Sequence, residues 1–151
     1  MSYSKSGALN KYGQVSVQAD ITYASPHRLI QMLLEGALEK IAIAKGHLAR
    51  GEIQPKGQHI GWAISIIGGL RASLDMQAGG DIAHNLNDLY DYMGRRLLHA
   101  NLKNDAAALD EVIGLLREVK SGWDAIPEAV QQAHAHAKAG AAAAEPSTAA
   151  R

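Results

Sequence analysis

Residues able to hold a metal or to carry acid–base chemistry are few and widely separated in this chain. Asp81 and His84 stand three apart, so on a helix they share one face. A di-iron bundle requires two Glu-x-x-His pairs and two further inward carboxylates, whereas this spacing occurs once, at a helix start where Asp81 serves better as an N-terminal cap. His134 and His136 lie about 200° apart around any helix and cannot bind one ion from one face. The sequence therefore predicts no metal site and no cofactor.

Motifs for nucleotide, acyl or nucleic-acid chemistry do not occur in the sequence. There is no G-x-S-x-G, Walker loop or Gly-rich dinucleotide turn, and Gly68-Gly69 falls inside a predicted helix, not between a strand and a helix. Arg95-Arg96 is too small a basic cluster to bind nucleic acid, and the spacing of Asp91 and Arg95 predicts an ion pair on a helix surface. Apart from His134 and His136, the histidines are expected to be isolated at solvated positions: His27, His47, His59, His84 and His99. We expect no enzymatic activity and no nucleic-acid partner.

Composition is typical of an intracellular protein. The 151 residues fit one domain, and fifteen Lys and Arg balance fifteen Asp and Glu, so no net charge attracts nucleic acid or an anionic membrane. Cysteine is absent, which excludes disulfides and thiolate metal sites and fits a reducing compartment. The N-terminal sequence lacks the apolar run of a signal peptide, and no stretch reaches the ~18 apolar residues of a membrane span. We expect a soluble cytoplasmic protein without membrane insertion.

Hydrophobic periodicity predicts four long helices, each with an apolar stripe at alternating three- and four-residue steps. They extend from about Pro26 to Arg50, from about Pro55 to Gln77, from a cap at Asp81 to a break at 101–104, and from a cap at Asn104 through Trp123. Their stripes are, in chain order, Ile30, Leu34, Ala37, Ile41, Ala44 and Leu48; Ile60, Ile64, Ile67, Leu70 and Leu74; Ile82, Leu86, Leu89, Met93, Leu97 and Ala100, with Tyr90, Leu98 and Leu102 beside them; and Leu109, Val112, Ile113, Leu116, Val119 and Trp123. Ser25-Pro26 predicts an N-cap followed by proline at the first helical position, and Gly51 predicts a left-handed stop. Connections of about two to six residues force sequential helices to run antiparallel. The predicted fold is an all-α, antiparallel up-down four-helix bundle over residues 25–126.

The segments on either side of the predicted bundle differ from it in composition. Residues 1–24 contain a short apolar set, which is expected to form a helical turn and an extended piece that cap the bundle by lying in a groove; permanent inclusion in the core is the alternative. That set is Leu9, Tyr12, Val15 and Val17. Residues 127–151 are alanine-rich and short of large apolar side chains, which predicts a disordered tail with at most transient helix.

The predicted helices carry more apolar surface than one stripe needs. Second sets lie beside the main stripes of the first two helices: Leu29, Leu33, Gly36 and Ile43, and Trp62, Ile66, Gly69 and Met76. In a compact bundle such wide stripes can pack against both neighbouring helices, which is the simplest explanation. Glycines inside the helices favour another explanation, because each costs up to ~1 kcal/mol relative to alanine and is useful where another backbone comes close. These glycines are Gly36, Gly61, Gly68, Gly69, Gly94 and Gly114. Shallow apolar grooves with glycine floors suit an amphipathic partner helix.

Three segments of the chain resemble the flagellar secretion chaperone family FliS. They are NKYGQVSV at 10–17, ASPHRLIQMLLEGAL at 24–38, and the stretch from KGQHIGW to EVIGLL at 56–116. The similarity covers about residues 8–126. Its most specific features are Ala-Ser-Pro at 24–26, Gly36-Ala37, Gly79-Gly80, and the run LYDYM at 89–93 that leads into RRLL at 95–98.

The resemblance implies an all-α export chaperone of the bacterial cytosol. Such a protein holds newly made flagellin by its disordered C-terminal segment, prevents premature polymerisation, and helps deliver flagellin to the flagellar type III export gate. The bound segment wraps around the bundle as short helices in apolar grooves, and the chaperone's N-terminal segment covers a surface that flagellin also uses, as a removable plug. Leu34-Glu35 departs from the usual aromatic-acidic pair before Gly-Ala, which implies a differently shaped pocket, and the tail after Pro127 has no counterpart.

From the stripes and the resemblance together, the partner-binding groove is assigned to nine apolar residues: Leu33, Leu34, Ala37, Ile41, Ile66, Leu70, Leu74, Tyr90 and Leu97. The expected partners are a flagellin C-terminal segment and a component of the export gate. A different class of function is a non-enzymatic structural or regulatory bundle that self-associates through the same grooves. Homodimerisation of the free protein stays open.

Overall fold

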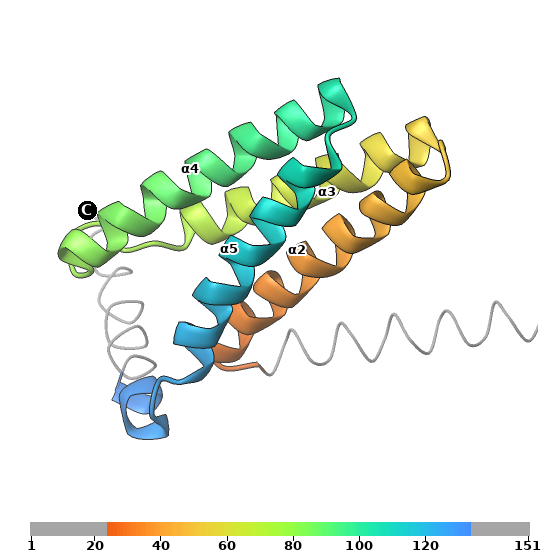
Figure 1. Ribbon diagram of the computed structural model, residues 1–151. Helices are drawn as coiled ribbons and strands as arrows, with labels where there is room; N and C mark the ends of the chain where they lie inside the picture. The colour runs from red at the N-terminus through yellow and green to blue at the C-terminus, as the bar shows by residue number, and fades with distance from the viewer. Residues whose placement is uncertain (1–23, 134–151) are drawn as a thin grey trace, which may run out of the picture. The chain divides into compact units, whose positions relative to one another are not determined.

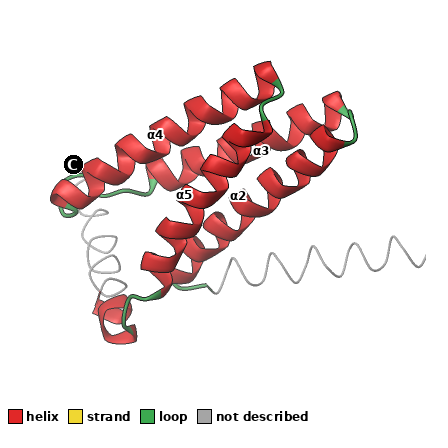
Figure 2. Ribbon diagram, in the orientation of Figure 1, coloured by secondary structure: helices red, strands yellow, loops and turns green. Residues whose placement is uncertain are grey.

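The computed structural model describes residues 24–133, and within that range it consists of helices and turns without a strand. The four long helices are Pro26–Ala49 (α2), Ile53–Ala72 (α3), Gly80–Lys103 (α4) and Ala106–Asp124 (α5). Figure 1 shows them running alongside one another, and Figure 2 shows the short turns that connect them. The predicted all-α fold of four long helices is confirmed.

The part from Ile30 to Ile126 forms one unit, in which neighbouring helices run antiparallel. Lys40 of α2 lies against Trp62 of α3, whereas His47, seven residues further along α2, lies against the earlier residue His59. The same reversal relates α3 to α4, where Lys56 pairs with Asn101 and Arg71 with Asp91. It relates α4 to α5, where Arg96 pairs with Glu111 and His99 with Asp105 at the start of α5. It also relates α2 to α5, where Gln31 pairs with Asp124 and Lys45 with Asp110. The four helices therefore alternate in direction.

One apolar face from each helix forms a single core. Its fully buried side chains include Leu34 and Ile41 of α2, Ile60 and Leu70 of α3, Met93 and Leu97 of α4, and Leu109, Val112 and Leu116 of α5. These residues belong to the predicted stripes. Ile82 was expected in the stripe of α4 but is 74% exposed. The antiparallel pairing of Arg71 with Asn87 sets Ile82 beyond the end of α3 at Ala72, so no side chain of α3 covers it.

The predicted helix ends at Ser25 and Gly51 are confirmed, and the one at Asn104 is not. The Arg28 backbone N–H donates to Ser25 Oγ at 3.1 Å, so Ser25 caps α2 as predicted, and Gly51 has the predicted left-handed backbone with φ of 70°. The prediction of Asn104 as the cap of the last helix is wrong. Asn104 has φ of 52° and ends α4, while Asp105 caps α5 by accepting from the Ala107 and Ala108 N–H groups at 3.0 and 3.3 Å. Asparagine tolerates the left-handed conformation, which frees the next residue to be the cap.

The connection between α3 and α4 is longer than predicted. α3 ends at Ala72 and not near Gln77, because the Ser73 hydroxyl donates to the Leu70 carbonyl oxygen at 2.6 Å and Asp75 Oδ1 accepts from the Gln77 and Ala78 N–H groups. These bonds replace helical ones with a turn.

The starts of α3 and α4 also differ from the prediction. α3 begins at Ile53, two residues before Pro55, which is accommodated in the first turn. Asp81 lies within the first turn of α4 and does not cap it, since the cap position is held by Gly79.

Beyond α5 the chain is described up to residue 133. The Pro127 carbonyl oxygen accepts from the Val130 and Gln131 N–H groups at 3.0 and 3.1 Å, so the alanine-rich segment begins with a helical turn. The expectations for residues 1–23, including the apolar set Leu9, Tyr12, Val15 and Val17, lie outside the described residues, as does the tail from residue 134. The segment boundaries placed at 24/25 and 126/127 stay predictions.

Candidate partner-binding groove

A hollow of about 230 Å³ opens between α3 and α4 on the outside of the bundle. We call it the α3–α4 groove and define it by its lining residues: Ile64, Ile67, Gly68, Arg71, Tyr90, Asp91, Gly94, Arg95 and Leu98. It combines an apolar surface with a short row of charged side chains. Such a concave, mostly apolar site is what a helical or extended peptide segment requires.

Missing side chains give the groove its depth. A Cβ atom added to Gly68 or to Gly94 would have no heavy atom within 4 Å, so a methyl group there would project into open space. Ile64 from α3 and Leu98 from α4 form the apolar walls, and Leu98 is 52% exposed. Helical glycines without a neighbouring atom bring no packing benefit to the isolated chain, although each costs up to ~1 kcal/mol in helix stability.

The charged row lies at the end of the groove nearest the α3 C-terminus. Arg71 Nε donates to Asn87 Oδ1 at 2.7 Å, and Arg71 Nη1 lies 3.2 Å from Asp91 Oδ1. Arg95 Nε lies 3.2 Å from the other Asp91 oxygen, so the predicted Asp91–Arg95 ion pair is confirmed. One carboxylate thus joins two guanidinium groups from different helices.

The nine residues assigned to the groove from the sequence divide into two groups. Six are buried in the core: Leu34, Ala37, Ile41, Leu70, Tyr90 and Leu97. Tyr90 also lines the α3–α4 groove with a side chain that is almost wholly buried, and burial raises the pKa of its phenol. Leu33, Ile66 and Leu74 are partly buried and pack against the core. The assignment of these nine residues to partner binding stays a prediction.

Other lining residues were not assigned to the groove from the sequence. Gly68 and Gly94 had been singled out as helical glycines, and Leu98 as apolar mass beside the main stripe. What joins them is the register of α3 against α4, set by Arg71 with Asn87 and Lys56 with Asn101. No pattern within one helix reveals that register.

Gly36 and Ile66, one residue from each of the two second apolar sets, meet on the face between α2 and α3. Ile66 Cδ1 lies 3.5 Å from the position a Cβ atom would take on Gly36. Trp62 is 54% exposed, and Lys40 Nζ lies 3.8 Å from the centre of its ring. We call this surface the α2–α3 face.

Two histidine predictions need correction. His47 and His59 were expected to be isolated, but their ring centroids lie 5.2 Å apart, because the antiparallel pairing of α2 and α3 brings them together. His27 was expected at a solvated position and is buried, with 6% of its surface exposed.

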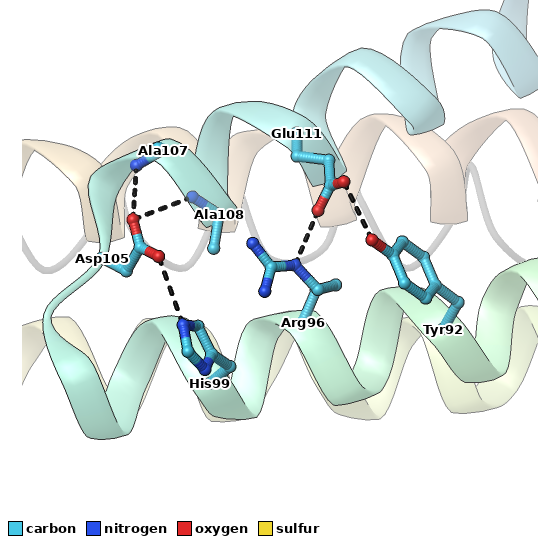
Figure 3. Close-up of polar contacts among 7 residues, drawn as sticks. All are labelled: Tyr92, Arg96, His99, Asp105, Ala107, Ala108 and Glu111. Atoms are coloured by element: carbon cyan, nitrogen blue, oxygen red, sulfur yellow. Dashed lines mark hydrogen bonds and ion pairs between the residues drawn. The ribbon is translucent and has the colours of Figure 1, made fainter.

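A polar cluster, which we call the α4–α5 clasp, joins the other face of α4 to α5 (Figure 3). Glu111 accepts from Tyr92 Oη at 2.9 Å and from Arg96 Nε at 2.6 Å. The hydrogen bond from Arg96, followed by that from Tyr92, lowers the pKa of Glu111. At the turn, the Ala108 N–H and the contact with His99 help to lower the pKa of Asp105. Both carboxylates are therefore held ionised, which suits helix pairing and not proton donation.

Within residues 24–133 the structure contains neither a metal-binding cluster nor a membrane-spanning helix. No three His, Cys, Asp or Glu side chains in this range gather closely enough to hold a metal ion. No described helix is both long enough and apolar enough to cross a membrane.

Comparison with known proteins relates most of the chain to one family. The sequence model of the family described as "Flagellar protein FliS" matches residues 8–130. A Pseudomonas aeruginosa protein named flagellar secretion chaperone FliSB is 55% identical over 119 residues, which cover 79% of this chain and 94% of that protein.

Proteins from two other organisms are also similar to this chain. The flagellar secretion chaperone FliS of Vibrio cholerae is 47% identical over 121 residues, covering 80% of this chain and 89% of that protein. The Salmonella typhimurium protein of the same name is 49% identical over 125 residues, covering 82% and 92%. All three names describe chaperones, a non-enzymatic role.

Proposed function

Because the chain belongs to the FliS family of flagellar secretion chaperones, we propose that it binds the C-terminal segment of flagellin in apolar grooves on its helical bundle. The observation that carries this proposal is the α3–α4 groove. Its apolar walls, Ile64 and Leu98, stand beside glycines whose missing side chains leave room for another backbone. A segment seated there would remove Leu98 from water and occupy the space above Gly68 and Gly94.

The chaperone action follows from covering the segment. A flagellin whose C-terminal segment lies in the grooves cannot offer that segment to other flagellin molecules, so premature polymerisation is prevented. The complex then delivers flagellin to a component of the type III export gate, and all of these steps take place in the bacterial cytosol. No catalytic chemistry is required, because binding and release are sufficient.

The α2–α3 face supports a second contact region for the same segment. The Trp62 ring is about half exposed, and Lys40 Nζ lies over it. Ile66, one turn further along α3, lies against Gly36 of α2. Exposed tryptophans are frequent anchors of protein interfaces because they bury a large area at a low cost in conformational entropy. A segment long enough to contact both surfaces would wrap around α3.

The direct experiment mixes the full chain with a synthetic flagellin C-terminal peptide and measures mass by size exclusion with light scattering. A 1:1 complex supports the proposal. The helical circular dichroism signal of the mixture should exceed the sum of the signals of the separate chain and peptide, because a disordered segment becomes helical as it binds. Calorimetry should give a large negative heat-capacity change. A concentration-dependent homo-oligomer that ignores the peptide would instead favour the self-associating structural bundle.

A further inference from the structure

The lining of the α3–α4 groove carries an excess of positive charge. Arg71 and Arg95 contribute two guanidinium groups, and Asp91 is the one carboxylate among the lining residues. Asp91 is shared between both arginines, at 3.2 Å from each. All three side chains are accessible to solvent, with 46%, 68% and 44% of the Arg71, Arg95 and Asp91 side chains exposed. The row therefore presents guanidinium groups to any segment that enters the groove.

The charges and the apolar walls occupy different parts of the groove. Arg71 reaches across from α3 to Asn87 and Asp91 of α4, and Arg95 reaches back to Asp91, so the guanidinium groups gather near Asp91. Leu98 lies seven residues further along α4, which is about 10 Å at a rise of 1.5 Å per residue. The cationic end and the apolar end are thus one to two helical turns apart, with the glycines between them.

We propose that the α3–α4 groove selects segments in which a carboxylate lies one to two helical turns from an apolar anchor residue. The anchor packs between Ile64 and Leu98, and the carboxylate binds Arg71 and Arg95. Arginine suits this role because its planar fork can donate two parallel hydrogen bonds to a carboxylate. The inference rests on the proposed function, since it takes the flagellin C-terminal segment as the occupant and adds the residues that choose its position in the groove.

Substitution of Asp91 distinguishes this inference from a purely structural role of the ion pairs. Asp91 competes with the incoming carboxylate for the same guanidinium groups, so Asp91→Asn should strengthen binding of an acidic segment, whereas Arg95→Gln should weaken it. If the ion pairs served only to hold α3 against α4, both changes would loosen the same contact and both would weaken binding. The two explanations therefore predict opposite signs for Asp91→Asn.

The test measures the affinity of a labelled flagellin C-terminal peptide by fluorescence anisotropy at low salt. Changing each Asp or Glu of the peptide to its amide, one at a time, should identify a position whose loss weakens binding about threefold to tenfold. Arg95→Gln should weaken binding of the unmodified peptide by a similar factor, and it should not weaken binding of that amide variant any further. Asp91→Asn should tighten binding about threefold, and raising salt tenfold should weaken only the peptides that keep the carboxylate.

Arg117→Gln on the exposed surface of α5 serves as the matched control and should leave the affinity unchanged. Circular dichroism and thermal melting verify that each variant is folded. Arg95→Lys keeps the positive charge but not the planar guanidinium group, so its affinity for the peptide should lie between those of wild type and Arg95→Gln. Affinities that do not respond to any amide substitution, or an Asp91→Asn variant that binds more weakly, overturn the inference while leaving the proposed function standing. A wild-type chain that binds no flagellin peptide contradicts both.

Discussion

Lys56 Nζ, in the first turn of α3, donates a hydrogen bond of 2.9 Å to the carbonyl oxygen of Asn101 in the last turn of α4. A second bond of 2.6 Å goes to Asn104 Oδ1, and Lys56 is only 2% exposed. The last carbonyl groups of a helix have no partner within it and carry its negative dipole end, so a cation there is favourable. This contact fixes the register of the two helices that form the α3–α4 groove.

Replacing Lys56 with methionine should lower the free energy of unfolding by about 1–3 kcal/mol. Methionine keeps most of the side-chain volume, so the loss comes from the Asn101 carbonyl and the Asn104 amide oxygen, which would be left without this donor. Urea denaturation measures the change. Lys103→Met, at an exposed position in the last turn of α4, is the control and should change stability by less than about 0.5 kcal/mol. A loss of that small size at Lys56 would show that the buried bonds contribute no net stability.

Helix periodicity was sufficient to predict the fold because the core is built from one stripe per helix. Leu34, Leu97 and Leu116 were each expected in a stripe and are fully buried. The errors lie where a side chain competes with the backbone for hydrogen bonds. Asp105 and not Asn104 caps α5, and Ser73 helps to end α3 at Ala72. Such choices depend on local geometry that residue type alone does not decide.

The groove was less predictable than the fold. The sequence assigned Leu70 and Leu97 to partner binding, but the most apolar stripes are also those that the core covers first. Gly68 and Gly94 become one floor only through the pairing of α3 with α4, which no single helix encodes. The sequence therefore indicated that spare apolar surface exists, and the structure shows where the groove opens.

Alanine at Gly68 and Gly94 together should weaken flagellin peptide binding while stabilising the protein. Each methyl group projects into open space in the groove, and alanine is favoured over glycine in a helix by about 0.5–1 kcal/mol. Loss of affinity with gain of stability cannot be explained by misfolding. Peptide titration and urea denaturation of the same preparation measure the two effects.

Gly114→Ala provides the matched control for the glycine pair. Gly114 lies within α5, outside the groove, and a Cβ atom there also has no neighbour within 4 Å. This substitution should give the same kind of stability gain with unchanged affinity. Equal affinities for the Gly68/Gly94 variant and the Gly114 variant would exclude the α3–α4 groove as the binding site.

Glu111 should make stability depend on pH below about 5. The hydrogen bonds from Arg96 and Tyr92 lower its pKa in the folded state, so between the unfolded and folded pKa values the unfolded chain binds more protons. The stabilisation from Glu111 is present above its unfolded pKa of about 4 and is lost as pH falls through the folded pKa. Glu111→Gln should therefore flatten the acid decline in the urea midpoint, whereas Glu118→Gln, exposed on the same helix, should leave it as in wild type. An unchanged acid decline in Glu111→Gln would show that other carboxylates control it.

Deleting residues 1–17 should preserve the fold and preserve or tighten binding of the flagellin peptide. The deletion removes Leu9, Tyr12, Val15 and Val17, whose apolar surface, worth roughly 25 cal/mol per Å² when buried, is expected to cover a groove that the client also uses. Without these side chains the client no longer has to displace them. A shorter deletion of residues 1–7, which keeps all four, is the control and should bind like the full chain. Thermal melting and peptide titration of both deletions give the comparison. An unfolded 1–17 deletion would make the segment part of the core, and a folded one that no longer binds would make it a direct client contact, so either result would replace the removable plug with a different role.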